Sequence, residues 1–397
     1  MLALVFLGRA SSDQVELSHS QKLQIIDAVW KDFHDLFYDS TFRGVDWDEI
    51  HRQYVGRVDQ AQTRPQLADL VRQMVATLRN SHSGFMTDEE YRRTKSVLPF
   101  FFDSVKGKVF VSYVFLPRRQ ELTIPIRFGD EILSVDDHPA AQMRLPTVFW
   151  VDPVMNNPYY GPAKSVAGVR VRRGPAVLNI TVPRMQRFGD VEPVQVRQLD
   201  HRTAYLRFLK MDRTTISPDA LKPILEKAMA SDALIIDVRH CVGGDATIIG
   251  MIGGMLLGPD VELQKTVRRG QSSSDKNVLT ERTSDFGVVY KGKVVLLTDG
   301  NTESGPEVLA AALKESGRAY LVGQRTRGAF NGYMEGLDLP FDFGILVVPV
   351  DRSVSPHGKE YEGIGVVPDL ASENSAADFE LGRDTVIEAA GRSLLLH

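Results

Sequence analysis

The chain has 397 residues, a length typical of two or three domains. Hydrophobic residues make up 43% and charged residues 25%, and the formal net charge is -4, so the composition is that of a globular protein without the basic excess of a nucleic-acid binder. The single cysteine, Cys241, excludes an intramolecular disulfide and a cysteine-rich zinc site. No apolar run approaches the roughly 18 residues that a membrane helix needs, and we predict no metal and no cofactor.

The N-terminus allows two interpretations. Residues 2–7 form a short apolar run, and the small residues Gly8 and Ala10 that follow it suit cleavage of a signal peptide. However, the run is shorter than the usual apolar region of such a peptide, and no Lys or Arg precedes it. Residues 1–10 are therefore either a truncated signal peptide, which favours a periplasmic or secreted location over a cytoplasmic one, or a frayed tail.

Residues 20–92 have a helical pattern. Apolar residues recur at helical spacing in two stretches, which are Ile25, Ile26, Val29, Trp30, Phe33, Leu36 and Phe37, and then Leu67, Leu70, Val71, Met74, Val75 and Leu78. Turn-forming residues at positions 79–84, which include Ser81 and His82, should end the second helix. We assign residues 1–92 to an N-terminal tail and helical region.

Residues 93–186 change to a strand pattern. Strand-like runs occupy residues 109–114, 131–135 and 178–182, and glycine, proline and aspartate punctuate them. The run 128–136, Phe-Gly-Asp-Glu-Ile-Leu-Ser-Val-Asp, resembles the signature strand of a PDZ domain, and Arg173-Gly174 with the strand after it resembles that domain's closing strand. A generic small β-barrel is the competing interpretation of this inserted β-rich domain.

Residues 187–397 alternate strands and helices. We expect strands at residues 204–208, 234–238, 293–298, 320–322 and 345–350, and helices at residues 220–229, after Asp245, and at residues 307–314. Repeated strand–helix units predict an α/β fold with a layered core.

Ser304 lies in the turn between the buried strand 293–298 and the helix 307–314. In open α/β folds ligands bind beyond the carboxyl ends of strands, and the first amides of the next helix point free N–H groups at them. A serine at this place can attack a carbonyl while those amides hold the oxyanion. The same position also suits a serine that only caps the helix.

Three further features suit chemistry, and each has a structural alternative. The pair Gly243-Gly244 follows a buried strand and can bind an oxyanion or phosphate, or only form a tight turn; neither GxGxxG nor GxxxxGK[ST] is present. His82 suits a general base or a structural histidine at a helix end. Glu362 suits the group that orients a catalytic histidine, or a surface carboxylate in a turn.

Four segments together resemble the tail-specific, or C-terminal processing, serine peptidase family. Residues 234–244, 302–313, 322–328 and 362–369 are similar to that family's Asp-Leu-Arg-x-x-x-Gly-Gly, nucleophile, Gly-Glu-x-Thr-x-Gly and Glu-Gly-x-Gly-x-x-Pro-Asp segments, in the same order and at similar spacing. With the PDZ-like insert and the helical start, the resemblance covers nearly the whole chain. It implies a crotonase/ClpP-like layered β-α protease core in residues 187–397, with residues 93–186 as the PDZ-like domain.

The family has two catalytic designs. One uses a serine–lysine dyad whose lysine directly follows the glycine of the Thr-x-Gly segment, and this chain has Ala329 there. The other, in the tricorn-core and retinoid-binding-protein-like branch, uses a Ser-His pair after an N-terminal helix, the nucleophilic serine and a late glutamate. Residues 45–48 and Tyr54 also resemble the helical region of that branch. Four residues match its catalytic positions: Ser81, His82, Ser304 and Glu362.

The resemblance implies a mechanism in which His82 takes the proton of Ser304 as the serine attacks the scissile carbonyl. Ser81 and Glu362 would form the relay that orients the histidine. Their order along the chain is no obstacle, because such constellations are defined by geometry.

The same resemblance implies that the amides of Gly244 and Gly305 bind the oxyanion. Pro306 departs from the family, which often has a small or acidic residue there, but proline fits the first turn of a helix. Cys241, beside the glycine pair, has no evident base partner in the sequence, and we interpret it as structural.

These observations favour a serine endopeptidase that acts on unstructured peptides or protein tails, captures a substrate C-terminus on the PDZ-like domain, and is compatible with a homo-oligomer. One alternative is a non-catalytic protein on the same fold that binds a hydrophobic ligand or a peptide. Another is an acyl-CoA enzyme of the related crotonase-like topology, which the PDZ-like insert and the lack of a basic phosphate site disfavour.

Overall fold

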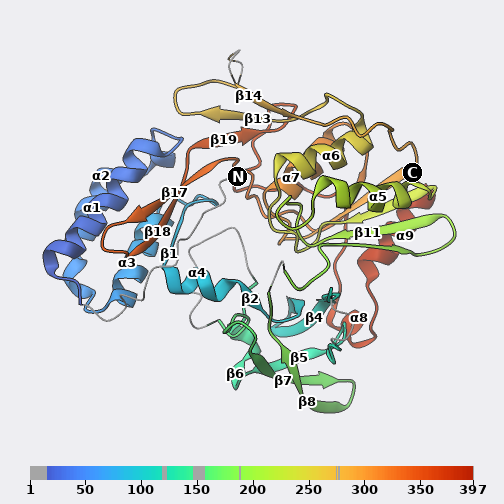
Figure 1. Cartoon of the computed structure of the whole chain (residues 1–397), viewed down its shortest axis with the longest axis horizontal. Coiled ribbons are helices and arrows are strands. Elements are labelled where there is room, and N and C mark those ends of the chain that lie inside the picture. Colours follow the sequence, from blue (N-terminus) through green and yellow to red (C-terminus); the bar gives the residue numbers. More distant parts are fainter. Residues whose placement is uncertain are drawn as a thin grey trace.

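A computed structural model describes residues 16–118, 123–145, 157–186, 189–273, 275 and 278–396. The signal-peptide interpretation of residues 1–10 lies outside these ranges. Three parts are visible in Figure 1: a helical N-terminal part in blue, a β-rich module in teal and green, and an α/β core. Among the described residues, no helix is both long and apolar enough to span a bilayer.

The core is built on a six-stranded sheet in the order β10-β11-β12-β15-β16-β20. Its strands are β10 (Val194–Gln198), β11 (Thr203–Phe208), β12 (Ala233–Asp237), β15 (Lys293–Thr298), β16 (Tyr320–Gly323) and β20 (Leu370–Ala371). Strand β10 is antiparallel to β11, and all other neighbours are parallel. The carboxyl ends of β12 and β15 therefore meet at one edge of the sheet, where ligands bind in such folds.

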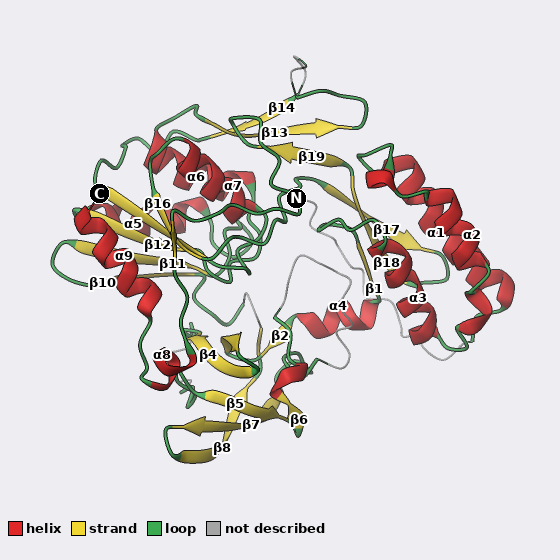
Figure 2. Ribbon diagram, turned by 180° about the vertical axis from the view of Figure 1, so that it is seen from behind, coloured by secondary structure: helices red, strands yellow, loops and turns green. Residues whose placement is uncertain are grey.

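Helices cover both faces of this sheet because side chains alternate along each strand. Along β12, Leu234 and Ile236 belong to the core cluster that α5, α6 and α7 share, whereas Ile235 packs on the other face with α9. Figure 2 shows these helices around the sheet. The helices are α5 (Pro218–Met229), α6 (Ala246–Leu257), α7 (Gly305–Glu315) and α9 (Thr385–Leu396).

The N-terminal helices pack on a separate three-stranded sheet in the order β1-β18-β17. Buried side chains from both sides, including Phe33, Leu67, Phe85 and Leu346, fill this second core. The sheet therefore joins the start of the chain to strands near its end. The elements are α1 (His19–Leu36), η1 (Phe42–Gly44), α2 (Trp47–Val55), η2 (Val58–Gln60), α3 (Arg64–Ala76), β1 (Gly84–Met86), β17 (Met334–Leu339) and β18 (Gly344–Pro349).

The β-rich module has an antiparallel sheet in the order β3-β4-β5-β7-β8, with β6 paired to β5. Helix α8 packs on it from the C-terminal part, where Phe379 stacks on Phe110 at 5.1 Å between ring centroids. The elements of this region are α4 (Asp88–Thr94), β2 (Ser96–Val97), β3 (Phe100–Val105), β4 (Lys108–Val114), β5 (Glu131–Val135), β6 (His138–Pro139), η3 (Ala140–Gln142), β7 (Val166–Arg173), β8 (Ala176–Pro183), β9 (Met185–Gln186) and α8 (Ala376–Glu380).

A second three-stranded sheet, in the order β14-β13-β19, lies beside α7 and links the core to the N-terminal part. Figure 2 shows it above the gap between those two parts. Its strands are β13 (Glu262–Arg268), β14 (Leu279–Arg282) and β19 (Asp351–Val354).

The predicted α/β fold and the predicted strands are confirmed, with bounds that agree to within a residue or two for β4, β5, β11, β12, β15, β16 and β18. One local difference concerns the region interpreted as helical up to residue 92. It contains strand β1, because Gly84–Met86 pairs antiparallel with residues 345–347 of β18. The domain boundaries at residues 92 and 186 stay a prediction.

Candidate active site

Ser304 occupies the N-cap position of α7, at the carboxyl end of the turn after β15. Its backbone has φ 62° and ψ −124°, whereas ordinary N-caps of this chain, such as Ser217 with φ −71° and ψ 154°, are extended. A positive φ in a residue with a Cβ costs on the order of 1–3 kcal/mol. The surroundings must therefore hold Ser304 in a conformation that helix capping alone does not require.

Glu307 is the residue that holds this turn. Its carboxylate accepts hydrogen bonds from the Ser304 N–H at 3.1 Å, the Thr326 hydroxyl at 2.5 Å, and the N–H groups of Gly328 and Ala329 at 2.7 Å each. The side chain is fully buried. Burial raises the pKa of Glu307 to about 7, against the hydrogen bonds that lower it. This role of Glu307 was not predicted, although Ser-x-x-Glu before a helix is a capping-box pattern.

Ser81, His82 and Glu362 form one hydrogen-bonded relay. The Ser81 hydroxyl donates to Glu362 Oε2 at 2.9 Å, the Ser81 N–H donates to Oε1 at 2.9 Å, and the hydroxyl lies 2.7 Å from His82 Nδ1. The turn after α3 supplies the first two residues, and its Asn80 side chain accepts from the His82 N–H at 2.9 Å. Ser81 and Glu362, which lie 281 positions apart in sequence, are thus in direct contact.

The His82 imidazole is enclosed by protein. His82 is only 1% exposed. Within the part of the chain that the structure describes, its Nε2 atom has no hydrogen-bond partner. Burial lowers the pKa of His82, while the charge of Glu362 raises it, and burial dominates. The ring is therefore neutral near pH 7 and has one nitrogen that can accept a proton.

Residues 328–331 connect the relay to the nucleophile turn. The Ser304 N–H donates to the Ala329 carbonyl at 2.9 Å, and the N–H groups of Phe330 and Asn331 donate to Glu362 Oε2 at 2.9 and 3.2 Å. Ala329 is the position at which the dyad design has a lysine, and here it is buried and contributes only its backbone. One short segment thus binds both the Ser304 turn and the carboxylate of the relay.

Gly244 and Gly305 lie against each other. A Cβ built on Gly305 would fall 3.0 Å from both the Cα and the N of Gly244. The turn after β12 runs beside the nucleophile turn, with Val242 bridged to Glu303 and the Gly243 N–H donating to the Glu303 carbonyl at 2.9 Å. Two amides next to Ser304 can therefore face one bound oxyanion.

Cys241 is fully buried in the core cluster of α5, α6 and α7. This environment agrees with a structural role, since a reactive thiol needs an accessible site. Among the described residues, one cluster has the side-chain types of a metal site, namely Asp103, His240 and Asp299. It lies between the β-rich module and the core rather than among the relay residues.

Comparison with known proteins gives two family matches. Residues 202–372 match the model of peptidase family S41, and residues 18–76 match the model of the tricorn protease C1 domain. The carboxyl-terminal-processing protease of Synechocystis is 22% identical over 404 residues, which cover 96% of this chain and 87% of that protein. The tricorn protease homolog 2 of Streptomyces coelicolor is 26% identical over 413 residues, which cover 93% of this chain but only 32% of that protein.

Solved structures with low identity share the fold. Mature CPAF in complex with lactacystin superposes with a TM-score of 0.64 at 16% identity, covering 95% of this chain and 98% of that one. The photosystem II D1 C-terminal processing protease gives a TM-score of 0.57 at 20% identity, covering 89% and 93%. The tricorn protease gives 0.56 at 18% identity, covering 95% of this chain and 36% of that one.

Proposed function

We propose that the chain is a serine endopeptidase of the S41 type, whose family model matches residues 202–372, and that it cleaves unstructured peptides or protein C-terminal tails. In this proposal Ser304 is the nucleophile, His82 is the general base, and Ser81 and Glu362 orient and polarise the histidine. The amides of Gly244 and Gly305 form the oxyanion hole.

The proposed reaction has two halves. Ser304 Oγ attacks the scissile carbonyl carbon as His82 Nε2 takes the hydroxyl proton, and the resulting oxyanion accepts hydrogen bonds from the two glycine amides. Collapse of this intermediate breaks the C–N bond, and the leaving amine takes the proton from His82. Water then attacks the acyl-enzyme with the same base, which restores Ser304 and releases the new carboxyl terminus.

The relay is the observation that carries the proposal. A carboxylate bonded through Ser81 to His82 Nδ1 fixes the ring, and it stabilises the positive charge that forms when Nε2 is protonated. The buried Nε2 atom, which has no hydrogen-bond partner among the described residues, suits that role better than a structural role, because buried polar atoms are normally hydrogen-bonded.

We further propose that the β-rich module captures the substrate. Its sheet ends in the edge strands β3 and β8, and extended peptides bind such edges by adding a strand. The resemblance of residues 128–136 to a PDZ signature strand supports a C-terminal carboxylate as the feature that is recognised.

Active-site labelling tests the nucleophile and its base. We expect the wild type to react with a fluorophosphonate probe and to cleave peptides, and we expect Ser304→Ala to lose both while staying folded by circular dichroism. His82→Ala should be nearly as damaging, and Cys241→Ala should be mild. Full cleavage by Ser304→Ala would exclude the assignment. Stoichiometric binding of a hydrophobic ligand without any labelling of the wild type would favour the non-catalytic alternative.

A further inference from the structure

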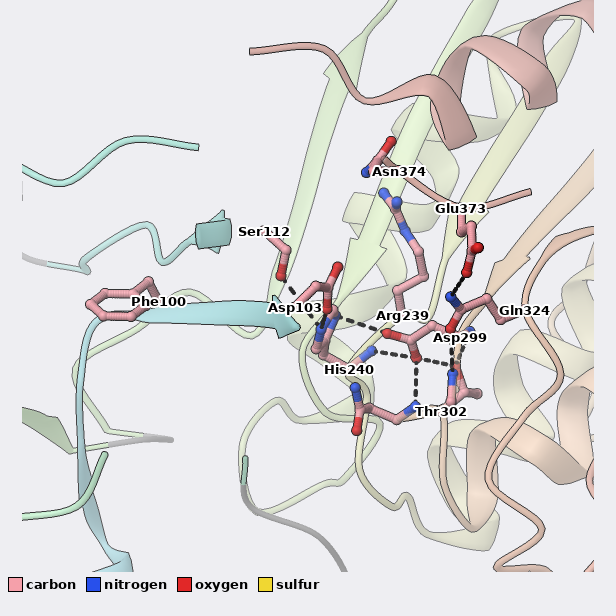
Figure 3. A network of polar contacts seen from close by, with 12 residues as sticks. Phe100, Asp103, Ser112, Arg239, His240, Asp299, Thr302, Gln324, Glu373 and Asn374 are labelled. Atoms are coloured by element: carbon pink, nitrogen blue, oxygen red, sulfur yellow. Dashed lines mark hydrogen bonds and ion pairs between the residues drawn. The ribbon is translucent and has the colours of Figure 1, made fainter. Parts of the chain in front are cut away.

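His240 lies between two carboxylates that come from different parts of the molecule. Its Nε2 atom is 2.8 Å from Oδ1 of Asp103, which lies on β3 of the module, and its Nδ1 atom is 3.0 Å from Oδ2 of Asp299, directly after β15 of the core. The side chains of His240 and Asp299 are 4% and 10% exposed, and that of Asp103 is 34% exposed. Figure 3 shows this arrangement.

Other groups around the ring complete its environment. Phe101 of β3 stacks on the imidazole at 4.9 Å between ring centroids and 11° between planes, and the Ser112 hydroxyl of β4 lies 3.5 Å from Nε2. From the core, Arg207 of β11 is the nearby positive charge that lowers the pKa of His240, but its guanidinium is already bound to Asp237 at 2.7 Å. The two carboxylates therefore dominate the electrostatics at the ring.

This geometry suits a protonated histidine rather than a metal ion. A metal ion binds one deprotonated ring nitrogen and gathers its other ligands around itself. Here the carboxylates of Asp103 and Asp299 contact different nitrogens of His240. Among the described residues, Nε2 hydrogen-bonds Asp103, whereas Nδ1 contacts Asp299 only at ion-pair distance. An imidazolium shares its positive charge over both nitrogens and can attract both carboxylates, whereas a neutral imidazole has no charge and only one N–H.

The other carboxylate oxygen of Asp299 joins the turn that begins at His240 to the turn that leads to Ser304. Asp299 Oδ1 accepts hydrogen bonds from the N–H groups of His240 and Asn301 and from the Thr302 hydroxyl, all at 3.0 Å. His240 begins the turn that leads to Gly244, and Asp299 begins the turn that leads to Ser304. The His240 backbone has φ 60°, a conformation that residues with a Cβ adopt only when their surroundings hold them there.

We propose that His240 is a positioning residue whose imidazolium joins the β-rich module to the loops that carry Ser304 and Gly244, so that turnover requires its protonated form. The proposal rests on the proposed peptidase function. Asp103 is partly exposed and belongs to the module, so a movement of β3 away from the core would take one of the two carboxylates away from the ring.

The direction of the pH effect follows from the charges. Burial alone would lower the pKa of His240, but Asp299 and Asp103 together raise it above its ordinary value. A folded-state pKa above the unfolded value means that the stabilising contact is complete below about pH 6.5 and is lost as the pH rises through the folded-state pKa. The turns that carry Gly244 and Ser304 should therefore become more mobile when the pH rises above the pKa of His240.

Asp103→Asn tests the coupling, because it keeps the size of the side chain and removes its charge. NMR titration of the His240 ring in the full chain should give a pKa above about 6.5 in the wild type and a lower value in Asp103→Asn. The alkaline limb of the kcat profile should move down by the same amount. Asp103→Glu should restore both. Asp137→Asn, an exposed aspartate in the same module, should change neither.

A wild-type His240 pKa at or below about 6.5, or an unmoved alkaline limb in Asp103→Asn, would overturn the proposal. Hydrogen exchange separates this outcome from failure of the proposed function, because it needs no turnover. Faster exchange at residues 238–245 and 299–304 in Asp103→Asn supports the coupling even if no probe labels Ser304. Unchanged exchange there, with labelling intact, contradicts the coupling alone.

Discussion

His82 owes its predicted reactivity to two opposed effects on one side chain. Burial lowers the pKa of the imidazole and keeps it neutral, while Glu362, acting through Ser81, raises the pKa and stabilises the protonated form. A base needs both effects, since it must be unprotonated before the reaction and must hold the proton during it. Burial and the contact through Ser81 together therefore set the pKa of the His82 imidazole.

The pH profile of kcat/KM should show this balance. Because burial lowers the pKa of His82, we expect activity to persist below the ordinary histidine value of about 6.5, with an acid limb at lower pH. Glu362→Gln removes the charge that raises this pKa, so the acid limb should move further down while the maximal rate falls. Glu360→Gln, an exposed neighbour in the same loop, should leave the profile unchanged. An acid limb above about pH 6.5 would contradict this description of the histidine.

Glu307 gives a second prediction, on stability. Its pKa is raised to about 7 in the folded state and is close to 4.5 in the unfolded state, so the folded protein holds a proton that the unfolded chain releases between these values. The carboxyl should therefore favour folding below about pH 4.5, and this contribution should decline by up to about 3 kcal/mol as the pH rises to about 7.

Urea unfolding of the wild type and Glu307→Gln at about pH 5 and 7.5 isolates this effect as a difference between the two proteins. At the lower pH the free energy of unfolding of the glutamine variant should be about 1–3 kcal/mol below that of the wild type, because its amide N–H₂ group faces the N–H donors of Gly328 and Ala329. Its deficit should shrink at the higher pH. A deficit that is constant or grows with pH would show that Glu307 is ionised throughout.

At the scale of elements, the start of α7 must lie directly against the turn after β12. Gly305→Ala tests this contact, because alanine is the better helix former by about 1 kcal/mol and the φ of Gly305 is not positive. Any loss of labelling rate must then come from the new Cβ, which would meet the Gly244 backbone at 3.0 Å and push the amides of Gly244 and Gly305 apart. We expect the rate of fluorophosphonate labelling to fall by about 10²-fold or more.

Gly391→Ala provides the matched control, since Gly391 lies in α9 with no atom within 4 Å of an added Cβ. It should label like the wild type and be slightly more stable. Equal labelling rates for Gly305→Ala and Gly391→Ala would mean that the two amides do not act together on an oxyanion.

The elements that could be predicted from sequence are those whose signal is local. The alternation and apolar character of residues 131–135 and 293–298 give strands β5 and β15 with the same bounds. Strand β1 could not be predicted in this way, because three residues have too short a pattern and their pairing partner, β18, lies more than 250 positions away.

The candidate site shows the same division. Motif resemblance selected Ser81, His82 and Glu362, and the structure brings these three side chains into contact, while their catalytic roles stay a prediction. The pairing of His240 with Asp103 had no sequence signal, because it depends on how the module packs on the core. Sequence therefore predicts residues that share a motif, and it misses contacts that only the arrangement of separate parts creates.

At the scale of the whole molecule, the N-terminal part contributes His82, the proposed base, to a site whose other residues come mostly from the C-terminal part. Strand β1 follows His82 directly, and its pairing with β18 anchors the turn that carries the histidine. Phe85 of β1 is fully buried and stacks on Phe343 at 5.3 Å between ring centroids. The hydrophobic core around Phe85 should therefore help to position His82, the proposed base.

Phe85→Ala should therefore affect activity as well as stability. Loss of a buried phenylalanine costs about 3–5 kcal/mol, and a shift of about 1 Å in the turn can lower kcat by about 10²-fold. Phe341→Ala is the control, since Phe341 lies between β17 and β18 and is 37% exposed. Unfolding midpoints and kcat, measured well below the melting temperature, separate the two effects. If Phe85→Ala is destabilised but keeps full kcat, the relay does not depend on β1, and the turn after α3 holds His82 by its own hydrogen bonds to Asn80 and Glu362.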